Sequence, residues 1–218
     1  MSQTSAIDQL TAHVQHHFVD SDQQFESAKM GMWVFLVTEI LFFGGLFAAY
    51  IVYRAWYPDL YIMASEQLDT FWGGVNTVVL IGSSLTVAMA IRSAQLNQQK
   101  GIVINLLITI ALAFVFMVIK YFEYSHKFEL GIFPGAYYTF EGIDHPQANI
   151  FFSIYYMMTG LHGVHVIVGI GLMVWLLVKA RKGVFHSNYY TPVEITGLYW
   201  HLVDIIWIFL FPLLYLID

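Results

Sequence analysis

Five long apolar stretches constrain the fold of this chain more than any other feature. Each is long enough to cross the ~30 Å hydrocarbon core of a bilayer, which takes about 20 mainly apolar residues. Backbone polar groups find no water there, so the stretches must be helical. The sequence therefore predicts an all-α, polytopic membrane protein, a bundle of five transmembrane helices within a domain of residues 29–218. The expected spans are residues 29–54, 71–92, 101–124, 150–178 and 194–217.

Composition excludes several classes of site and partner. Of the 218 residues 58% are hydrophobic and none is Cys, which excludes disulfides, thiolate zinc sites and iron–sulfur clusters in this chain. Residues 1–28 form a polar N-terminal tail without the segments of a signal peptide, so the first span is expected to direct insertion. The net charge of -6 gives no basis for a nucleic-acid partner.

The basic residues predict the orientation. The ends on the side of the N-terminus carry Lys29, Arg92, Lys100, Lys179, Arg181 and Lys182, and the opposite ends carry Arg54, Lys120 and Lys127. Since cytoplasmic ends are enriched in Lys and Arg, the N-terminus is expected in the cytoplasm and the C-terminus in the periplasm.

Ionisable side chains inside the spans are the candidate functional residues. Glu39 and Asp204 lie ten residues into the first and last spans, about 15 Å deep at 1.5 Å per residue. His162 and His165 share a helix face in TGLHGVHV, and His201 precedes Asp204 by three residues. Because charges in hydrocarbon are costly, these groups should be neutral, paired or turned toward protein.

Two interpretations of these residues stay open. His162, His165, His201 and Asp204 form a polar cluster that packs helices together, or they take part in function. No residue one helical turn from Glu39 can pair with it, since its neighbours are Phe35, Leu36, Phe42 and Phe43.

The histidines do not predict a metal site. His13, His16 and His17 spell HxxHH, a spacing that membrane di-iron enzymes use. Those enzymes need several such clusters at the same helix ends to fill two metal shells, whereas this one stands alone in the tail. Two haems and a copper would need more His ligands than the three in the spans, so this chain is expected to bind no metal or haem.

Local signals mark the connections between spans. Thr191, Pro192 and Glu194 read as a capping box that opens the last span, with Thr191 as N-cap and Glu194 reaching back. Residues 58–70 are expected to be a short acidic loop. The glycines and prolines of residues 125–149 predict a longer irregular loop.

Five blocks of sequence carry a family resemblance. In order they are FLVTEILFFGG, VNTVVLIGSSLT, YFEYSHKF, MTGLHGVHVIVG and LYWHLVDIIWIFLF. Together they resemble cytochrome c oxidase subunit III in its five-helix bacterial form. The resemblance implies a non-catalytic core subunit of an aa3- or caa3-type haem–copper oxidase in the bacterial inner membrane. Subunit I, with the haem a and copper, would be the direct partner, and subunit II and small subunits further ones.

The resemblance also implies roles for particular residues. Glu39 matches the family's buried carboxyl that reacts with carbodiimides and faces a lipid-filled cleft. Lys179, Arg181 and Lys182 become candidates for phospholipid headgroups, as basic juxtamembrane clusters attract anionic lipid. The subunit would support lipid and oxygen access and sustained proton uptake by subunit I. Longer family members have two additional N-terminal helices that close the cleft, and this chain has no room for them.

Two alternatives remain at this stage. Subunit III of a quinol oxidase, or an accessory subunit of nitric oxide reductase, would also have five helices, although Glu within TEILFF favours the cytochrome c branch. A proton-coupled transporter could use Glu39, Asp204 and the histidines, but the sequence shows no repeat pair or broken helix of the transporter kind.

Overall fold

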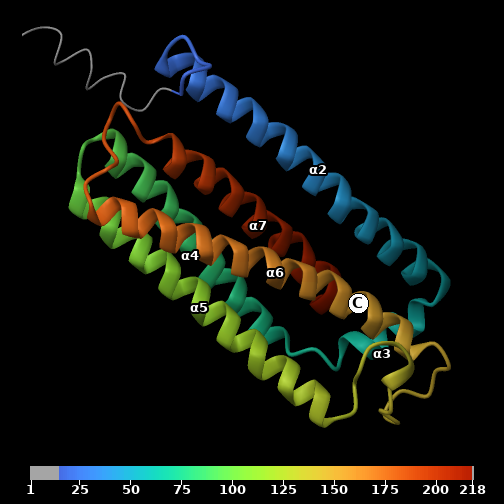
Figure 1. Cartoon of the computed structure of the whole chain (residues 1–218). Helices are drawn as coiled ribbons and strands as arrows, with labels where there is room; N and C mark the ends of the chain where they lie inside the picture. Colours follow the sequence, from blue (N-terminus) through green and yellow to red (C-terminus); the bar gives the residue numbers. More distant parts are fainter. Residues whose placement is uncertain (1–14, 218) are drawn as a thin grey trace, which may run out of the picture.

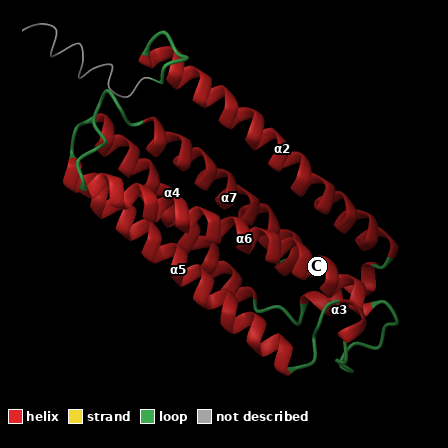
Figure 2. Ribbon diagram, in the orientation of Figure 1, coloured by secondary structure: helices red, strands yellow, loops and turns green. Residues whose placement is uncertain are grey.

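Long helices dominate the computed structural model, which describes residues 15–217 (Figures 1 and 2). Two short elements, the helix α3 (Pro58–Ser65) and the 3-10 turn η1 (Gly135–Tyr137), lie in the connections. Within residues 15–217, five helices are long and apolar enough to cross a membrane, which confirms the predicted all-α, five-span architecture. They are α2 (Ser21–Trp56), α4 (Thr70–Gln95), α5 (Gln99–Glu129), α6 (Ala148–Arg181) and α7 (Thr191–Tyr215).

Four of the helices form a closed bundle, and the fifth lies outside it. Helices α4 and α6 each pack against both α5 and α7, whereas α2 runs along α7 and α6 (Figure 1). In the most apolar stretch of α7, 56% of the residues are buried, against 17% in α2. Helix α7 is therefore the core of the molecule, and α2 is an outer wall with a large lipid-accessible surface.

Small residues allow α6 and α7 to approach closely. A Cβ added at Gly169 of α6 would lie 2.5 Å from Cζ3 of Trp200 on α7, closer than real Cβ contacts. The Trp200 ring is fully buried, and its Nε1 donates to Ser83 Oγ on α4 at 2.9 Å. Packing at small residues is a main source of helix association in membranes. Gly169 therefore sets the separation of α6 and α7.

Two segments outside the expected spans contain helix: the end of the polar tail and the loop 58–70. Helix α2 begins at Ser21, inside the expected polar tail, because the Asp20 side chain accepts a hydrogen bond from Gln23 N at 2.7 Å. The expected acidic loop 58–70 holds α3, which starts at Pro58 and buries Tyr61 while packing against α6. Apolar burial outweighed the loop-like composition of this segment.

The expected capping box at the start of α7 is wrong by one residue. Tyr190, not Thr191, is the N-cap, and no side chain forms a cap hydrogen bond there. The carboxylate of Glu194 instead lies 3.3 Å from Lys29 Nζ on α2. An ion pair between two helices has replaced the local contact that the pattern predicted.

Candidate functional site

Glu39 of α2 has a partner that the sequence did not reveal. Its Oε2 lies 3.1 Å from Nε2 of His165 on α6, and both side chains are largely buried. The Phe43 ring packs against the imidazole edge to face, with 5.3 Å between centroids. Tyr199 of α7 donates to the His165 carbonyl oxygen at 3.0 Å. Helices α2, α6 and α7 thus converge on this carboxyl–imidazole pair.

The geometry fixes how protons are arranged in the pair. His165 Nδ1 lies 2.8 Å from the Leu161 carbonyl oxygen, which can only accept, so Nδ1 carries a hydrogen. The contact between Nε2 and Glu39 therefore holds one further proton, either on a neutral carboxyl or on an imidazolium. The two forms differ only in where that proton lies, so the pair can hold a proton inside the membrane without an isolated charge.

The other residues of the expected polar cluster lie in separate environments. His162 is fully buried between Phe116 and Trp207, and neither ring nitrogen has a hydrogen-bond partner among residues 15–217. His201 Nδ1 lies 2.6 Å from Ser84 Oγ and joins α7 to α4. Asp204 is 2% exposed. Its carboxyl faces Ser84 but makes no hydrogen bond of normal geometry within the described chain.

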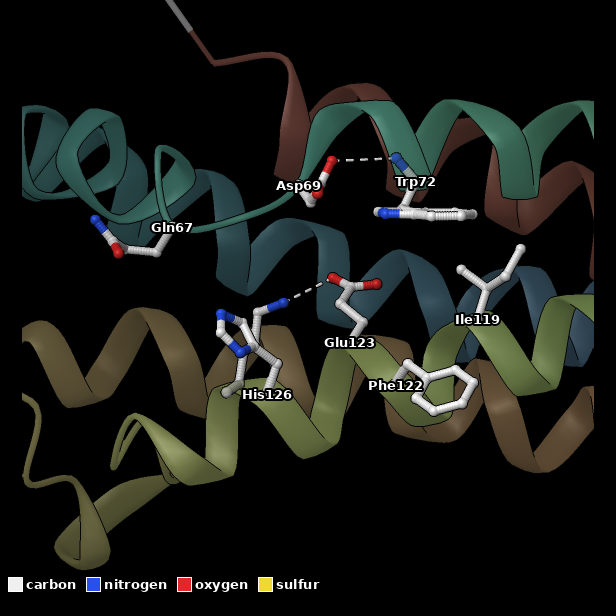
Figure 3. Close-up of a pocket in the computed structure, with 8 residues that line it drawn as sticks. Gln67, Asp69, Trp72, Ile119, Phe122, Glu123 and His126 are labelled. Carbon is white, nitrogen blue, oxygen red and sulfur yellow. Dashed lines mark hydrogen bonds and ion pairs between the residues drawn. The ribbon is translucent and has the colours of Figure 1, made fainter.

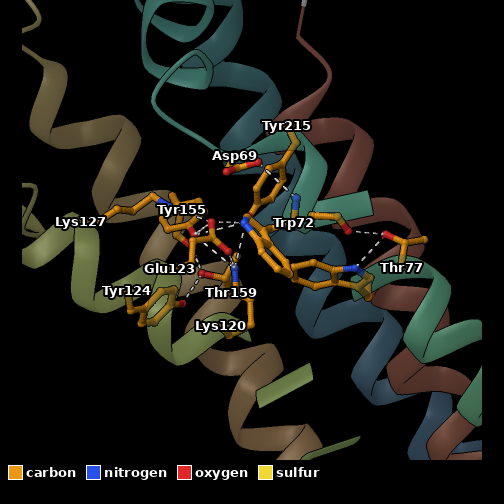
Figure 4. A network of polar contacts seen from close by, with 12 residues as sticks. Asp69, Trp72, Thr77, Lys120, Glu123, Tyr124, Lys127, Tyr155, Thr159 and Tyr215 are labelled. Carbon is orange, nitrogen blue, oxygen red and sulfur yellow. Dashed lines mark hydrogen bonds and ion pairs between the residues drawn. The ribbon is translucent and has the colours of Figure 1, made fainter. Parts of the chain in front are cut away.

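A second polar site, which the sequence reasoning missed, lies in the last turns of α5 (Figure 4). Glu123 Oε2 accepts from Lys120 Nζ at 2.9 Å, and Oε1 accepts from Lys127 Nζ at 2.8 Å. These side chains are only 3% to 8% exposed. Two buried ammonium groups therefore share one buried carboxylate.

Tyrosines from two other helices complete this Glu123 network. Tyr155 of α6 and Tyr215 of α7 donate to Glu123 Oε1 at 2.8 and 2.6 Å, and Lys120 Nζ donates to both hydroxyls. Next to it, the hydroxyls of Tyr124 and Thr159 are hydrogen-bonded at 2.5 Å. A buried network of this kind, shared by three helices, holds them in one arrangement. The signal was present in KYFEYSHKF, residues 120–128, where Lys120, Glu123 and Lys127 follow i, i+3, i+7 on one face.

The basic residues at the end of α6 lie at the opposite end of the bundle. Lys179 Nζ is 4.1 Å from the centroid of the Trp175 ring, and Arg181 and Lys182 are exposed. A cavity of about 310 Å³ between α5 and α6 is lined by Lys100 and Arg181, with Val103 and Ile104 beneath them. Cations above apolar side chains at a helix end suit an anionic group at the membrane surface.

The described part of the chain holds no group of three or more His, Cys, Asp or Glu side chains that could bind a metal ion. His16 and His17 of the HxxHH motif are exposed before α2. His13 lies outside the described residues, so the structure says nothing of the complete motif.

These features define a class of protein: a multi-pass membrane protein with a carboxyl–imidazole pair near the middle of a spanning helix and a buried ionic network. Comparison with known proteins identifies the family. The sequence profile of cytochrome c oxidase subunit III matches residues 11–218. Cytochrome c oxidase subunit 3 of Thermostichus vulcanus is 34% identical over 86% of this chain and 86% of its own length.

Two further relatives show the range of the family. A probable quinol oxidase subunit 3 of Staphylococcus haemolyticus is 30% identical over 87% of this chain and 88% of its own length. A heme-copper oxidase subunit I+III of Aeropyrum pernix is 28% identical over 96% of this chain, which covers 24% of that protein. The chain belongs to the cytochrome c oxidase subunit III family and is subunit III of a haem–copper oxidase.

Proposed function

We propose that this chain is the non-catalytic subunit III of an aa3- or caa3-type cytochrome c oxidase, and that it docks on subunit I. The similarity to a cytochrome c oxidase subunit 3 over most of both chains carries this proposal. The A. pernix relative, whose name joins subunits I and III in one protein, supports direct contact with subunit I. Haem a and copper would then belong to partner subunits, with subunit II and small subunits completing the complex.

The Glu39–His165 pair is the centre of the supporting role. It lies between the outer wall α2 and the bundle, and Glu39 remains 17% exposed at its side chain. A small reagent or a lipid chain can therefore reach the carboxyl. This geometry supports the interpretation of Glu39 as the carbodiimide-reactive acid in a lipid-accessible position, where it helps subunit I to sustain proton uptake with lipid and oxygen access preserved.

The chain would lie in the bacterial inner membrane with its N-terminus cytoplasmic and its C-terminus periplasmic. Two of the three basic residues on the expected periplasmic side, Lys120 and Lys127, are buried and bound to Glu123. Only Arg54 is left as an accessible cation there within residues 15–217. The excess of basic residues on the expected cytoplasmic side is therefore larger among accessible residues than in the whole sequence. This excess supports the orientation.

Phospholipid would be the ligand of the basic end. Lys179, Arg181 and Lys182 surround the end of α6, and Lys100 reaches the same cavity from α5. An anionic headgroup at this cavity would place its acyl chains along Val103 and Ile104.

A quinol oxidase is the second candidate, supported by the S. haemolyticus relative. Mild-detergent purification through this chain, followed by an absorbance spectrum and oxidation assays, separates the two. Haem a bands with cytochrome c oxidation are expected. Quinol oxidation without cytochrome c oxidation would move the chain to the quinol branch. A haem-free preparation without a subunit I partner would overturn both.

A further inference from the structure

Helix α2 is packed unevenly along its length. Its buried residues are Leu36, Phe43 and Tyr50, which are seven residues apart, so one narrow seam holds the helix against the bundle. None of the described residues before Leu36 is buried. The first half of α2, residues 21–35, therefore lies beside the bundle without a side chain that is enclosed by protein.

A hollow of about 900 Å³ runs along this first half. The described residues that line it all belong to α2, from Gln23 to Val34. Met30, Trp33 and Val34 are each more than half exposed. Segments with few buried apolar contacts are those that open at low cost in free energy. The first half of α2 has this property, whereas the second half does not.

One ion pair clasps the first half of α2 to α7. Lys29 Nζ lies 3.3 Å from Glu194 Oε1, and the two side chains are 36% and 17% exposed. The aromatic contact beside it is loose, with 6.0 Å between the ring centroids of Phe25 and Tyr190. A partly exposed ion pair shifts an equilibrium by at most about fivefold, and salt screens it. The clasp is therefore weak enough to open reversibly.

The other end of α2 is anchored. Tyr50 is fully buried, and its hydroxyl donates to the carbonyl oxygen of Leu213 on α7. Its ring packs edge to face on Tyr61 of α3, with 5.2 Å between centroids. The buried Tyr61 ring in turn contacts Phe151 of α6 at 4.9 Å. Tyr50 is thus held by three other helices, and it is the point about which α2 can tilt.

The bundle is rigid at the same end of the molecule. Asp69 accepts a hydrogen bond from the backbone N–H of Trp72 at 3.2 Å and fixes the start of α4 (Figure 3). Glu123 of α5 accepts from Lys127 at 2.8 Å and from Tyr215 of α7 at 2.6 Å. A tilt of α2 about Tyr50 is therefore a movement against a fixed frame.

We propose that α2 is a strap that pivots at Tyr50, with the Lys29–Glu194 ion pair as its clasp. When the clasp opens, the strap lifts from α6 and water reaches the Glu39–His165 pair. The 11 residues from Glu39 to Tyr50 span about 17 Å, so a tilt of about 10° moves Glu39 by about 3 Å, the width of a water molecule. The strap thus controls when the pair exchanges its proton, an inference that rests on the role proposed above for Glu39.

Distance measurements by double electron–electron resonance on the purified oxidase complex test the strap. The chain has no Cys, so spin labels can be placed by substitution, and a preparation without introduced Cys gives the background from partner subunits. Ser27→Cys on α2 with Arg181→Cys at the end of α6 reports the clasp end, and both positions are exposed. Ala55→Cys on α2 with Glu129→Cys on α5, also exposed, is the matched pair at the anchored end.

The pair at the clasp end is expected to show a second population about 6 Å longer, because the 23 residues from Ser27 to Tyr50 form a lever of about 35 Å. Glu194→Gln should raise the fraction of this population about two- to fivefold, and so should high ionic strength in wild type. Lys29→Gln is a second variant in case Glu194→Gln fails to assemble. Glu26→Gln is the matched control, since Glu26 is exposed on the same helix and has no ion pair within residues 15–217.

A single, unchanged distance at the clasp end in Glu194→Gln and Lys29→Gln would overturn the strap. An equal second population at the anchored end would overturn the pivot at Tyr50.

Turnover of the oxidase tests the link to Glu39. Glu194→Gln should change turnover by no more than the factor by which the open fraction changes, and this effect should vanish in a Glu39→Gln background. An effect of Glu194→Gln that persists without Glu39, or no effect when the open fraction has risen, would overturn control of the pair by the strap. If Glu39→Gln alone leaves turnover unchanged while the two distances are present, the proposed role of Glu39 fails and the strap stands.

Discussion

Glu39 Oε2 and His165 Nε2 are 3.1 Å apart, and a hydrogen bond between them needs one proton on either atom. His165 cannot turn to release it, because Nδ1 is held by the Leu161 carbonyl oxygen and Phe43 packs against the ring. The carboxyl is therefore fixed in position while its proton is not. This separates the structural role of Glu39, which joins α2 to α6, from any role in holding a proton.

Glu39→Gln tests that separation. The Gln amide can donate to His165 Nε2 and keeps the volume of the side chain, so the chain should assemble with a loss of stability below about 1 kcal/mol. Turnover of the oxidase should change modestly, and carbodiimide labelling of this chain should disappear. Complex yield, oxygen consumption and intact-mass measurement check the three expectations. Labelling that persists in the variant would point to another carboxyl, and total loss of turnover would contradict a supporting role.

The Glu123 network predicts strong non-additivity. Glu123→Leu leaves Lys120 and Lys127 buried without their common carboxylate, which should cost about 3–5 kcal/mol. The triple change Lys120→Met, Glu123→Leu and Lys127→Met removes both orphaned charges and should recover much of that loss. Thermal unfolding of the purified complexes gives the comparison. A triple variant no more stable than Glu123→Leu would show that the lysines are not the source of the cost.

The close approach of α6 and α7 predicts a contrast between two glycines of the same helix. Gly169→Ala places a methyl group against the Trp200 ring and should destabilise the chain by about 1–3 kcal/mol. Gly171→Ala has open space at its Cβ and should be neutral or slightly stabilising, because Ala favours helix. The melting temperatures of the two variants test this contrast. Equal values would mean that α6 and α7 can separate at no cost.

Tyr61 predicts a dependence of stability on alkaline pH. Its hydroxyl is buried in α3 without a hydrogen-bond partner in the described chain, and burial raises the pKa of Tyr61 above its usual value. The unfolded chain then releases this proton at about pH 10 while the folded chain retains it. The contribution of Tyr61 to the free energy of unfolding is complete below about pH 10 and decreases as the pH rises above that value. Tyr61→Phe should flatten the curve of unfolding temperature between about pH 9 and 11 relative to wild type.

The sequence predicted those features that depend on hydrocarbon as a solvent. Five spans and their order followed from apolar length. The partner of Glu39 did not follow, because His165 is 126 residues away and only packing brings α2 beside α6. The Glu123 network was missed for the opposite reason: lysines near a span end read as interfacial, whereas Tyr155 and Tyr215 bury them in protein.

Local signals were the least reliable part of the prediction. Asp20 and Pro58 begin helices inside segments that their polar composition marked as tail and loop. Thr191 looks like a cap but is already helical, since Glu194 is engaged by Lys29 of another helix. A local cap decided the start of α2, whereas contacts with other helices decided the starts of α3 and α7.

The length of α2 has a practical consequence. Its 36 residues rise about 54 Å, well beyond the ~30 Å hydrocarbon core of a membrane. The eight residues from Ser21 to Ala28 form about 12 Å of helix before Lys29, the first basic anchor of the span. An affinity tag or fluorescent protein joined ahead of Asp20 would stand on a rigid spacer clear of the lipid surface. Such a fusion gives a handle for isolating the complex while leaving α4 to α7 untouched.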